Sequence, residues 1–206
     1  MLFDILCLIS LLVVILNLRR LVNIFPSLMA CIIRWKESVN LEASVKHSLD
    51  RDMIAIAMIL PFCLTVYRFG LYTPKFMTQI DEAYRLPATI GIILVYIGLR
   101  YIMGHMFRSR KINPKIQKAA GRSAFTFFTI LTLLLIGTGS VMSFMKIAPE
   151  VIRSAMLWVS AAIYCIFIIR KTQIFASSCS IFTAFLYLCA PEIFPTGALV
   201  ASALIL

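Results

Sequence analysis

The chain has 206 residues, of which 61% are hydrophobic and 14% charged, and its formal net charge is +11. A soluble domain has about 45–50% apolar and about 25% charged residues, and it could not bury this much apolar surface. The composition therefore excludes an ordinary soluble protein. Apolar runs of about 20 residues indicate an all-α membrane protein, whereas membrane strands would show short runs of alternating polarity.

The positive charge does not indicate nucleic-acid binding. The basic residues stand in short connections between apolar runs, not on a separate polar domain. Basic residues in such places set membrane topology and contact anionic lipid headgroups. We therefore expect membrane lipids as partners, with anionic headgroups at the basic loops, and no nucleic acid.

The hydrophobic runs predict a polytopic transmembrane helix bundle of six to seven spans in a single domain. We expect spans at residues 2–18, 52–72, 87–107, 123–145, 150–169 and 173–190, and a short apolar segment at 196–206. The last segment would cover only about 17 Å at about 1.5 Å per residue, so it is either a half-span or a re-entrant end.

The connections differ in character. Residues 21–51 are expected to be interfacial and cytoplasmic. The first part, residues 21–35, is interrupted by Pro26. It either extends the first helix or lies in the interface, with Trp35 at headgroup depth. Residues 108–122 form a strongly basic loop with a short surface helix. Tight turns are expected at 146–149 and 170–171, and a rigid turn at 191–195.

The distribution of basic residues predicts the orientation. Of the 20 Lys and Arg residues, 14 follow the first, third and fifth spans, and five follow the second and fourth. Cytoplasmic connections carry the excess of basic residues. The sequence thus predicts a multi-pass protein of the cell inner membrane, with a retained first span, the N-terminus outside, and the loops at 19–51 and 108–122 in the cytoplasm.

Arg100 is the main candidate site residue, because a charged side chain within a span is costly and is often functional. Tyr96 lies four residues before it, and Tyr101 and His105 form a second pair at the same spacing. Together these residues could receive a lipid phosphate or a small anion. Alternatively, Arg100 lies close enough to the cytoplasmic end of its span to extend its guanidinium to the interface.

Three further residues are weaker candidates for lipid or substrate binding. Tyr67 and Arg68 stand at the outer end of the second span, where the arginine could simply reach the interface. Glu192, between two prolines at the outer end of the sixth span, could bind a proton or a cation or could be an ordinary turn residue.

Motifs for metal or catalytic chemistry are weak. Asp50 and Asp52 have the spacing of a metal-binding D-x-D pattern, but carboxylates also suit the start of a helix. The sequence has no metalloprotease, nucleophile-elbow or P-loop motif. We therefore expect no metal and no cofactor, and we assign no catalytic residue.

Several spans are rich in small and hydroxylated residues, many of them spaced three or four positions apart. They include Thr126, Thr129, Thr132, Gly137 and Gly139, then Ala176, Ser180 and Ala184, and finally Gly197 with Ala201 and Ala198 with Ser202. Such stripes let helix backbones approach closely. They fit packing within the bundle or packing against another membrane subunit.

Two segments carry a resemblance to a known family. These are the run FLYLCAPEIFP at residues 185–195 and the basic turn near Met106 and Phe107. On them the chain resembles a family of uncharacterised integral membrane proteins from Bacteroidota, known only as a domain of unknown function. The resemblance implies an inner-membrane location and supplies no activity.

Three functions follow as hypotheses. The first is a non-enzymatic subunit or accessory factor that contacts a larger membrane complex through its helices, because small-residue stripes are present without a catalytic constellation. The second is a carrier for a small or lipidic anion that uses Arg100. The third is a lipid-modifying membrane enzyme. An enzyme is the less favoured class.

Overall fold

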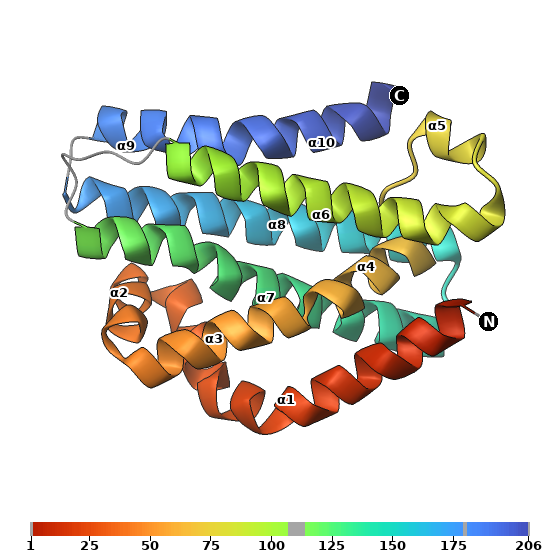
Figure 1. Ribbon diagram of the computed structural model, residues 1–206, viewed down its shortest axis with the longest axis horizontal. Coiled ribbons are helices and arrows are strands. Elements are labelled where there is room, and N and C mark those ends of the chain that lie inside the picture. Colours follow the sequence, from red (N-terminus) through yellow and green to blue (C-terminus); the bar gives the residue numbers. More distant parts are fainter. Residues whose placement is uncertain (1, 107–113, 179–180, 206) are drawn as a thin grey trace.

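The structure is a computed structural model that describes residues 2–106, 114–178 and 181–205 (Figure 1). Every regular element in these ranges is a helix. The elements are α1 (Leu2–Ile33), α2 (Trp35–Ala43), α3 (Val45–Ala57), α4 (Ile59–Arg68), α5 (Lys75–Thr78), α6 (Glu82–Met106), α7 (Pro114–Phe144), α8 (Pro149–Ala176), α9 (Ile181–Leu188), the π-helix η1 (Cys189–Ile193) and α10 (Phe194–Ile205).

Four of these helices, α1, α6, α7 and α8, are long and apolar enough to cross a membrane. Their outer faces carry large apolar side chains that are mostly exposed, such as Leu16, Val95 and Trp158. A surface of this kind suits lipid rather than water. The predicted fold class, an all-α transmembrane bundle, is thus confirmed.

The first helix is longer than the first predicted span. α1 has 32 residues and continues through Pro26, with a bend along its course (Figure 1). An internal proline removes one backbone hydrogen bond and bends a helix without ending it when neighbouring helices support both halves. The chain leaves the helical conformation only at Arg34, where φ is −131° and ψ is 119°.

The expected helix start at residues 50–52 is wrong. These residues lie inside α3, which begins at Val45, and α4 follows after Met58 alone, so that α3 and α4 run as one nearly continuous segment across the bundle (Figure 1). The helix begins earlier because its polar residues are packed inward: Ser48 and Arg51 are buried, in contact with α2 and α7.

The expected turn at residues 170–171 is also wrong. α8 runs without interruption from Pro149 to Ala176. Two charged residues do not end a helix when their side chains find partners, and both do: Arg170 donates from Nε to the carbonyl oxygen of Ile32 (2.8 Å), and Lys171 is buried and pairs with Glu192. Residues 150–176 contain no glycine or proline that would favour a turn.

The C-terminal segment is a single helical path, and the rigid turn expected at 191–195 is not formed. α9, η1 and α10, of 8, 5 and 12 residues, follow one another without a break and lie along α6 and α8 (Figure 1). Together they are long enough for a bilayer core of about 30 Å. Residues 173–190 and 196–206 are therefore not two separate segments: residues 173–176 belong to α8, and residues 181–205 belong to this path.

The core is built where α1, α3, α7 and α8 meet. It includes Ile24, Leu28, Ile54, Ile130 and Phe167, all nearly inaccessible. The buried threonines of α7 bond to their own helix, for example Thr132 Oγ1 to the carbonyl oxygen of Phe128 at 2.9 Å. A Cβ atom at Gly139 would stand 2.8 Å from the ring of Phe69. Much of the small-residue stripe on α7 thus serves packing within the bundle.

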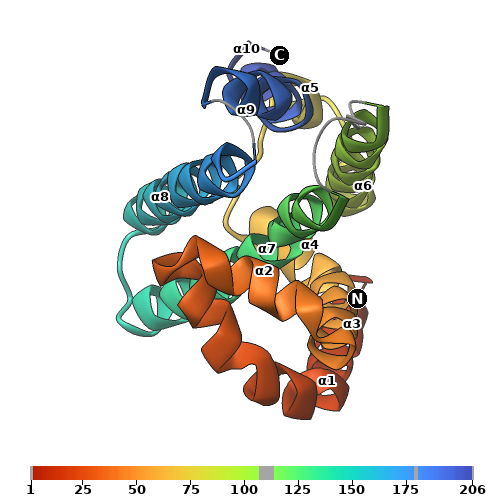
Figure 2. The same cartoon turned by 90° about the vertical axis from the view of Figure 1, so that its left-hand side faces the viewer.

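One end of the bundle is strongly basic, and we call it the basic end. It carries α2, the end of α6, the start of α7 and the end of α8, as Figure 1 shows, whereas the N-terminus, α5 and the end of α10 lie at the opposite end. The predicted loop at 108–122 falls here: residues 107–113 lie outside the described part, and residues 114–122 form the first turns of α7. Viewed from the basic end, the path from α9 to α10 lies apart from α1–α3, with α6 and α8 on either side (Figure 2).

Candidate functional site

A buried carboxylate joins three helices at the C-terminal path. Glu192 of η1 is 2% exposed and forms ion pairs with Arg100 of α6, through Nη2, and with Lys171 of α8, through Nζ. Lys171 is 5% exposed, and the side chain of Arg100 is 23% exposed. We call Glu192, Arg100 and Lys171 the Glu192 cluster.

The π-helix places this carboxylate. Pro191 has no backbone N–H, and within a regular helix its ring would clash with the preceding turn. Here the backbone N–H of Phe194 bonds to the carbonyl oxygen of Cys189, five residues earlier, so the turn is wider. Single π-turns inside α-helices are frequent at functional sites. Glu192 thereby lies within reach of both α6 and α8.

Aromatic rings and hydroxyls surround the cluster. The buried ring of Phe167 lies 5.1 Å from Arg100 Cζ and 5.5 Å from Lys171 Nζ, distances at which a ring face stabilises a cation. The hydroxyl of Tyr164 donates to the backbone carbonyl oxygen of Glu192 at 3.2 Å. Phe167 thus stabilises the two cations, and Tyr164 fixes the backbone of the π-turn.

The charges of the Glu192 cluster do not balance. With all three groups ionised, two positive side chains face one negative side chain, so the cluster has a net charge of +1. Excess charge in a low-dielectric environment is costly unless another group compensates it. The cluster is therefore suited to receive an anion. Among the described residues no group of three His, Cys, Asp or Glu side chains could hold a metal ion.

The structure changes the interpretation of Arg100 and Glu192. Arg100 does not extend its guanidinium to the interface but turns inward to Glu192. The sequence predicts Arg100 near the cytoplasmic end of its span and Glu192 at the outer end of another span. Tyr96, four residues earlier, is near the same segment but bonds through its hydroxyl to Thr196 Oγ1 at 2.9 Å. These contacts place two of the candidate residues together and Tyr96 one turn away.

The other predicted residues lie elsewhere. Tyr101 is 74% exposed and stacks on His105 at 6.5 Å on the outer face of α6. Tyr67 packs against the ring of Phe3 at 5.9 Å, and Arg68 is exposed, both near the end opposite the basic end. None of these four residues contacts the Glu192 cluster in the described part of the chain.

Lys171 was missed because it was read as a turn residue. Its position in a long apolar stretch without glycine or proline was the available signal. A lysine four residues after Phe167 lies on the same face of a continuous helix, and this spacing could have indicated an inward position. The pairing with Glu192 could not have been derived, because it depends on how the C-terminal path docks.

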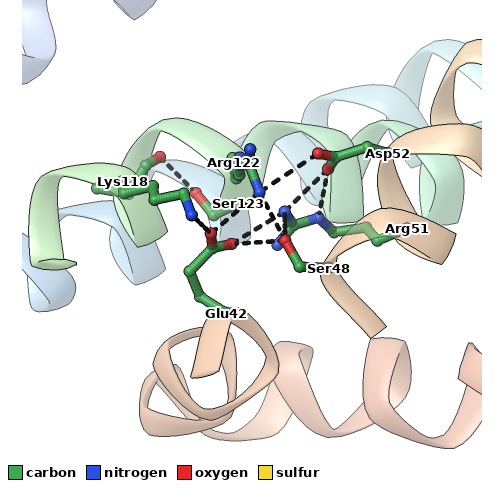
Figure 3. A network of polar contacts seen from close by, with 8 residues as sticks. Glu42, Ser48, Arg51, Asp52, Lys118, Arg122 and Ser123 are labelled. Atoms are coloured by element: carbon green, nitrogen blue, oxygen red, sulfur yellow. Dashed lines mark hydrogen bonds and ion pairs between the residues drawn. The ribbon is translucent and has the colours of Figure 1, made fainter. Parts of the chain in front are cut away.

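A second polar network lies at the basic end (Figure 3). Glu42 of α2 accepts from Arg51 Nη2 (3.0 Å), Lys118 Nζ (2.9 Å) and Arg122 Nη1 (3.0 Å). Asp52 accepts from Arg51 Nη2 at 2.9 Å and lies 3.4 Å from Arg122 Nη1. We call these five residues the Glu42 network. It ties α2 and α3 to the first turns of α7.

This network explains the D-x-D pattern. Asp52 is engaged by two arginines, and Asp50 points instead toward Arg20, with 3.8 Å between Oδ1 and Nε. The two carboxylates thus serve separate ion pairs, as alternate residues on one helix do when they point in different directions. The metal interpretation of Asp50 and Asp52 is not supported by their positions.

The Glu42 network should make stability depend on pH. Burial alone would raise the pKa of Glu42, but hydrogen bonds from Lys118 and Arg51 and the nearby charges outweigh it, so its pKa lies below the usual value of 4.5. An acid with a lowered pKa stabilises the folded state above its unfolded pKa and stops doing so as the pH falls through the folded pKa. We expect the free energy of unfolding to drop below about pH 4.5, and Glu42→Gln to reduce that drop. An equal drop in the variant would show that other groups cause it.

Comparison with known proteins gives a family and no activity. A family model described as "Domain of unknown function (DUF4271)" matches residues 3–202, almost the whole chain. No curated protein and no solved structure matches the chain. The predicted resemblance to an uncharacterised family is confirmed in this form, and the chemistry must be argued from the side chains.

Proposed function

For this chain, a member of the DUF4271 family by its match over residues 3–202, we propose that it is a membrane carrier for a small or lipidic anion, with the Glu192 cluster as its binding site. The observation that carries the proposal is the convergence of Arg100 and Lys171 on one buried carboxylate. Of the three functions open from sequence, this one makes use of that arrangement.

A buried excess of positive charge supports a binding site over a structural ion pair. The Glu42 network also has one more base than acids, but its Lys118 is 55% exposed to solvent, whereas Lys171 is buried. A structural ion pair needs one cation for Glu192. The second cation, the buried Lys171, adds a desolvation cost, and no further anion compensates its charge. An incoming carboxylate or phosphate would bring the missing negative charge. Arg100 offers a planar pair of donors to such a group, and Glu192 is the resident anion with which the ligand exchanges.

Uptake into proteoliposomes tests the carrier function. Acetate and inorganic phosphate serve as small-anion probes, and transbilayer movement of labelled phosphatidic acid serves as the lipidic probe. We expect one of them to be transported, and Arg100→Leu and Lys171→Met each to lower the rate at least about tenfold, which is about 1.4 kcal/mol of lost stabilisation. Arg68→Gln removes an exposed positive charge outside the cluster and should leave the rate unchanged. Equal rates in all four proteins, or transport of none of the probes, would contradict the proposal.

A second candidate is a subunit of a larger membrane assembly. One observation favours it: Gly197 and Ala201 of α10 are exposed and lie one turn apart on the same face, so another helix could approach closely there. Ala184 of the preceding stripe is instead fully buried, and Ser180 lies outside the described residues. Purification in mild detergent followed by mass spectrometry should recover a second polypeptide, which Gly197→Leu should release. A single polypeptide in both preparations would speak against this role.

The proposed location is the inner membrane of a bacterial cell, with the basic end in the cytoplasm. Under the positive-inside rule, reporters fused at residues 40, 115 and 178 should report cytoplasm, and reporters at 78 and 148 the opposite side. The signals at 40 and 78 require α3–α4 to cross. If the path from α9 to α10 also crosses, a fusion after residue 205 reports the outside as well. A cytoplasmic signal at 78 together with an outside signal at 115 would reverse the orientation.

A further inference from the structure

A hollow at the basic end lies where α1 ends and α2 begins. It has a volume of about 360 Å³ and is lined by Arg34, Lys36, Glu37, Asn40 and Arg170, with Trp35 and Ile33 at its sides. Arg34 has an extended backbone between the two helices, and Arg170 of α8 lines the hollow and donates to the carbonyl oxygen of Ile32. It is separate from both the Glu192 cluster and the Glu42 network.

The charge in this hollow is positive and partly fixed in place. Three basic side chains, Arg34, Lys36 and Arg170, stand against one acid, Glu37. Arg170 is held by bonds from Nε to the carbonyl oxygen of Ile32 and from Nη1 to Gln173 Oε1, both 2.8 Å. An anchored guanidinium loses less conformational freedom on binding a phosphate than a freely moving one.

The position of the hollow matches the headgroup layer of a membrane. α1 and α8 are both long and apolar enough to cross a bilayer, and the hollow lies at the end of α1, beside Arg170 in the last turns of α8. The ring of Trp35 lies under Lys36 Nζ at 5.9 Å, and tryptophan is typical of the membrane interface. Ile33, on the membrane side of Arg34, is exposed and could contact an acyl chain.

We propose that this hollow binds the phosphate headgroup of an anionic phospholipid. Arg34, Lys36 and Arg170 supply the positive charge, Asn40 supplies a further polar contact, and the exposed Ile33 faces the acyl region. The bound lipid bridges the ends of α1 and α8 and holds α2 against them. Basic pockets between helices on the cytoplasmic side of a membrane are suited to such headgroups. The site is independent of the proposed carrier function.

Native mass spectrometry of the full-length protein tests the site. The protein is mixed with phosphatidylglycerol or with phosphatidylcholine, and the retained lipid is measured. We expect phosphatidylglycerol to be retained preferentially, and Arg34→Gln together with Lys36→Gln to weaken its binding at least about tenfold. Lys46→Gln together with Arg19→Gln removes the same charge from exposed positions outside the hollow and should change binding less than about twofold.

The other outcomes are equally decisive. An equal loss in the control variant would show binding by general surface charge and would overturn the specific site. A third outcome has two parts: inorganic phosphate binds and prevents retention of phosphatidylglycerol, and the protein shows no preference between the two lipids. This result would assign the hollow to free phosphate and overturn the proposal of a lipid site. Arg170→Gln serves as a third variant, with its melting temperature measured, because Arg170 also supports the end of α1.

Discussion

Replacing Glu192 by leucine should lower the free energy of unfolding by about 3–5 kcal/mol, because it leaves the buried Lys171 and the partly buried Arg100 facing each other without a carboxylate. The loss should be larger than the change in volume suggests, since leucine has nearly the size of glutamate. It should also free the C-terminal path, because Glu192 is the acid of η1 that pairs with the charges on α6 and α8 in the described part of the chain. Denaturant titration in detergent measures the free energy, and protease sensitivity of α10 reports the detachment.

The matched variant is Lys171→Met, which keeps an apolar stem and leaves Arg100 and Glu192 as a neutral pair. It should cost less than about 1 kcal/mol and could stabilise the fold, because a buried lysine no longer has to be desolvated. A loss as large as that of Glu192→Leu would show that Lys171 is a structural partner, and the argument from excess charge would fail.

The second large effect is expected at the basic end, where replacing Glu42 by leucine should cost about 3–5 kcal/mol. Glu42 accepts from three cations, and Arg51, which is 2% exposed, cannot reach water when this acceptor is lost. Asp52 alone would then face Arg51 and Arg122. Thermal unfolding in detergent, followed by circular dichroism, measures the change.

Arg51→Met is the comparison for the Glu42 network. It removes a buried cation and leaves two acids, Glu42 and Asp52, with two bases, Lys118 and Arg122, so the charges balance. We expect a loss of about 1–2 kcal/mol, corresponding to the hydrogen bonds of the guanidinium. A greater loss from Arg51→Met than from Glu42→Leu would contradict the charge argument.

The fold class was predictable because it depends on local properties of the chain. Runs of about 20 apolar residues have one stable form in a bilayer, the helix, whatever their tertiary contacts. The boundaries were harder, because charged residues and prolines were read as helix ends. Arg170, Lys171 and Pro191 all lie within helical segments, since tertiary partners or a π-turn satisfy them.

The candidate site was predictable only in part. Arg100 and Glu192 could be selected singly, because each is a charge among apolar residues. Their pairing joins residues 92 positions apart and depends on the docking of the C-terminal path beside α6, which no local pattern encodes. The Glu42 network was hidden for the same reason: its acids and bases come from α2, α3 and α7.

The most direct test of the Glu192 cluster as an anion site is the affinity of the purified protein for acetate and inorganic phosphate, before and after Glu192→Gln. The amide keeps the shape of the side chain but no longer competes for Arg100 and Lys171. We predict that the wild-type protein binds at least one probe, that Glu192→Gln binds it at least about tenfold more tightly, and that Arg100→Leu abolishes binding. Failure of the wild-type protein to bind either probe, or an affinity that Glu192→Gln leaves unchanged in a folded protein, would contradict the account.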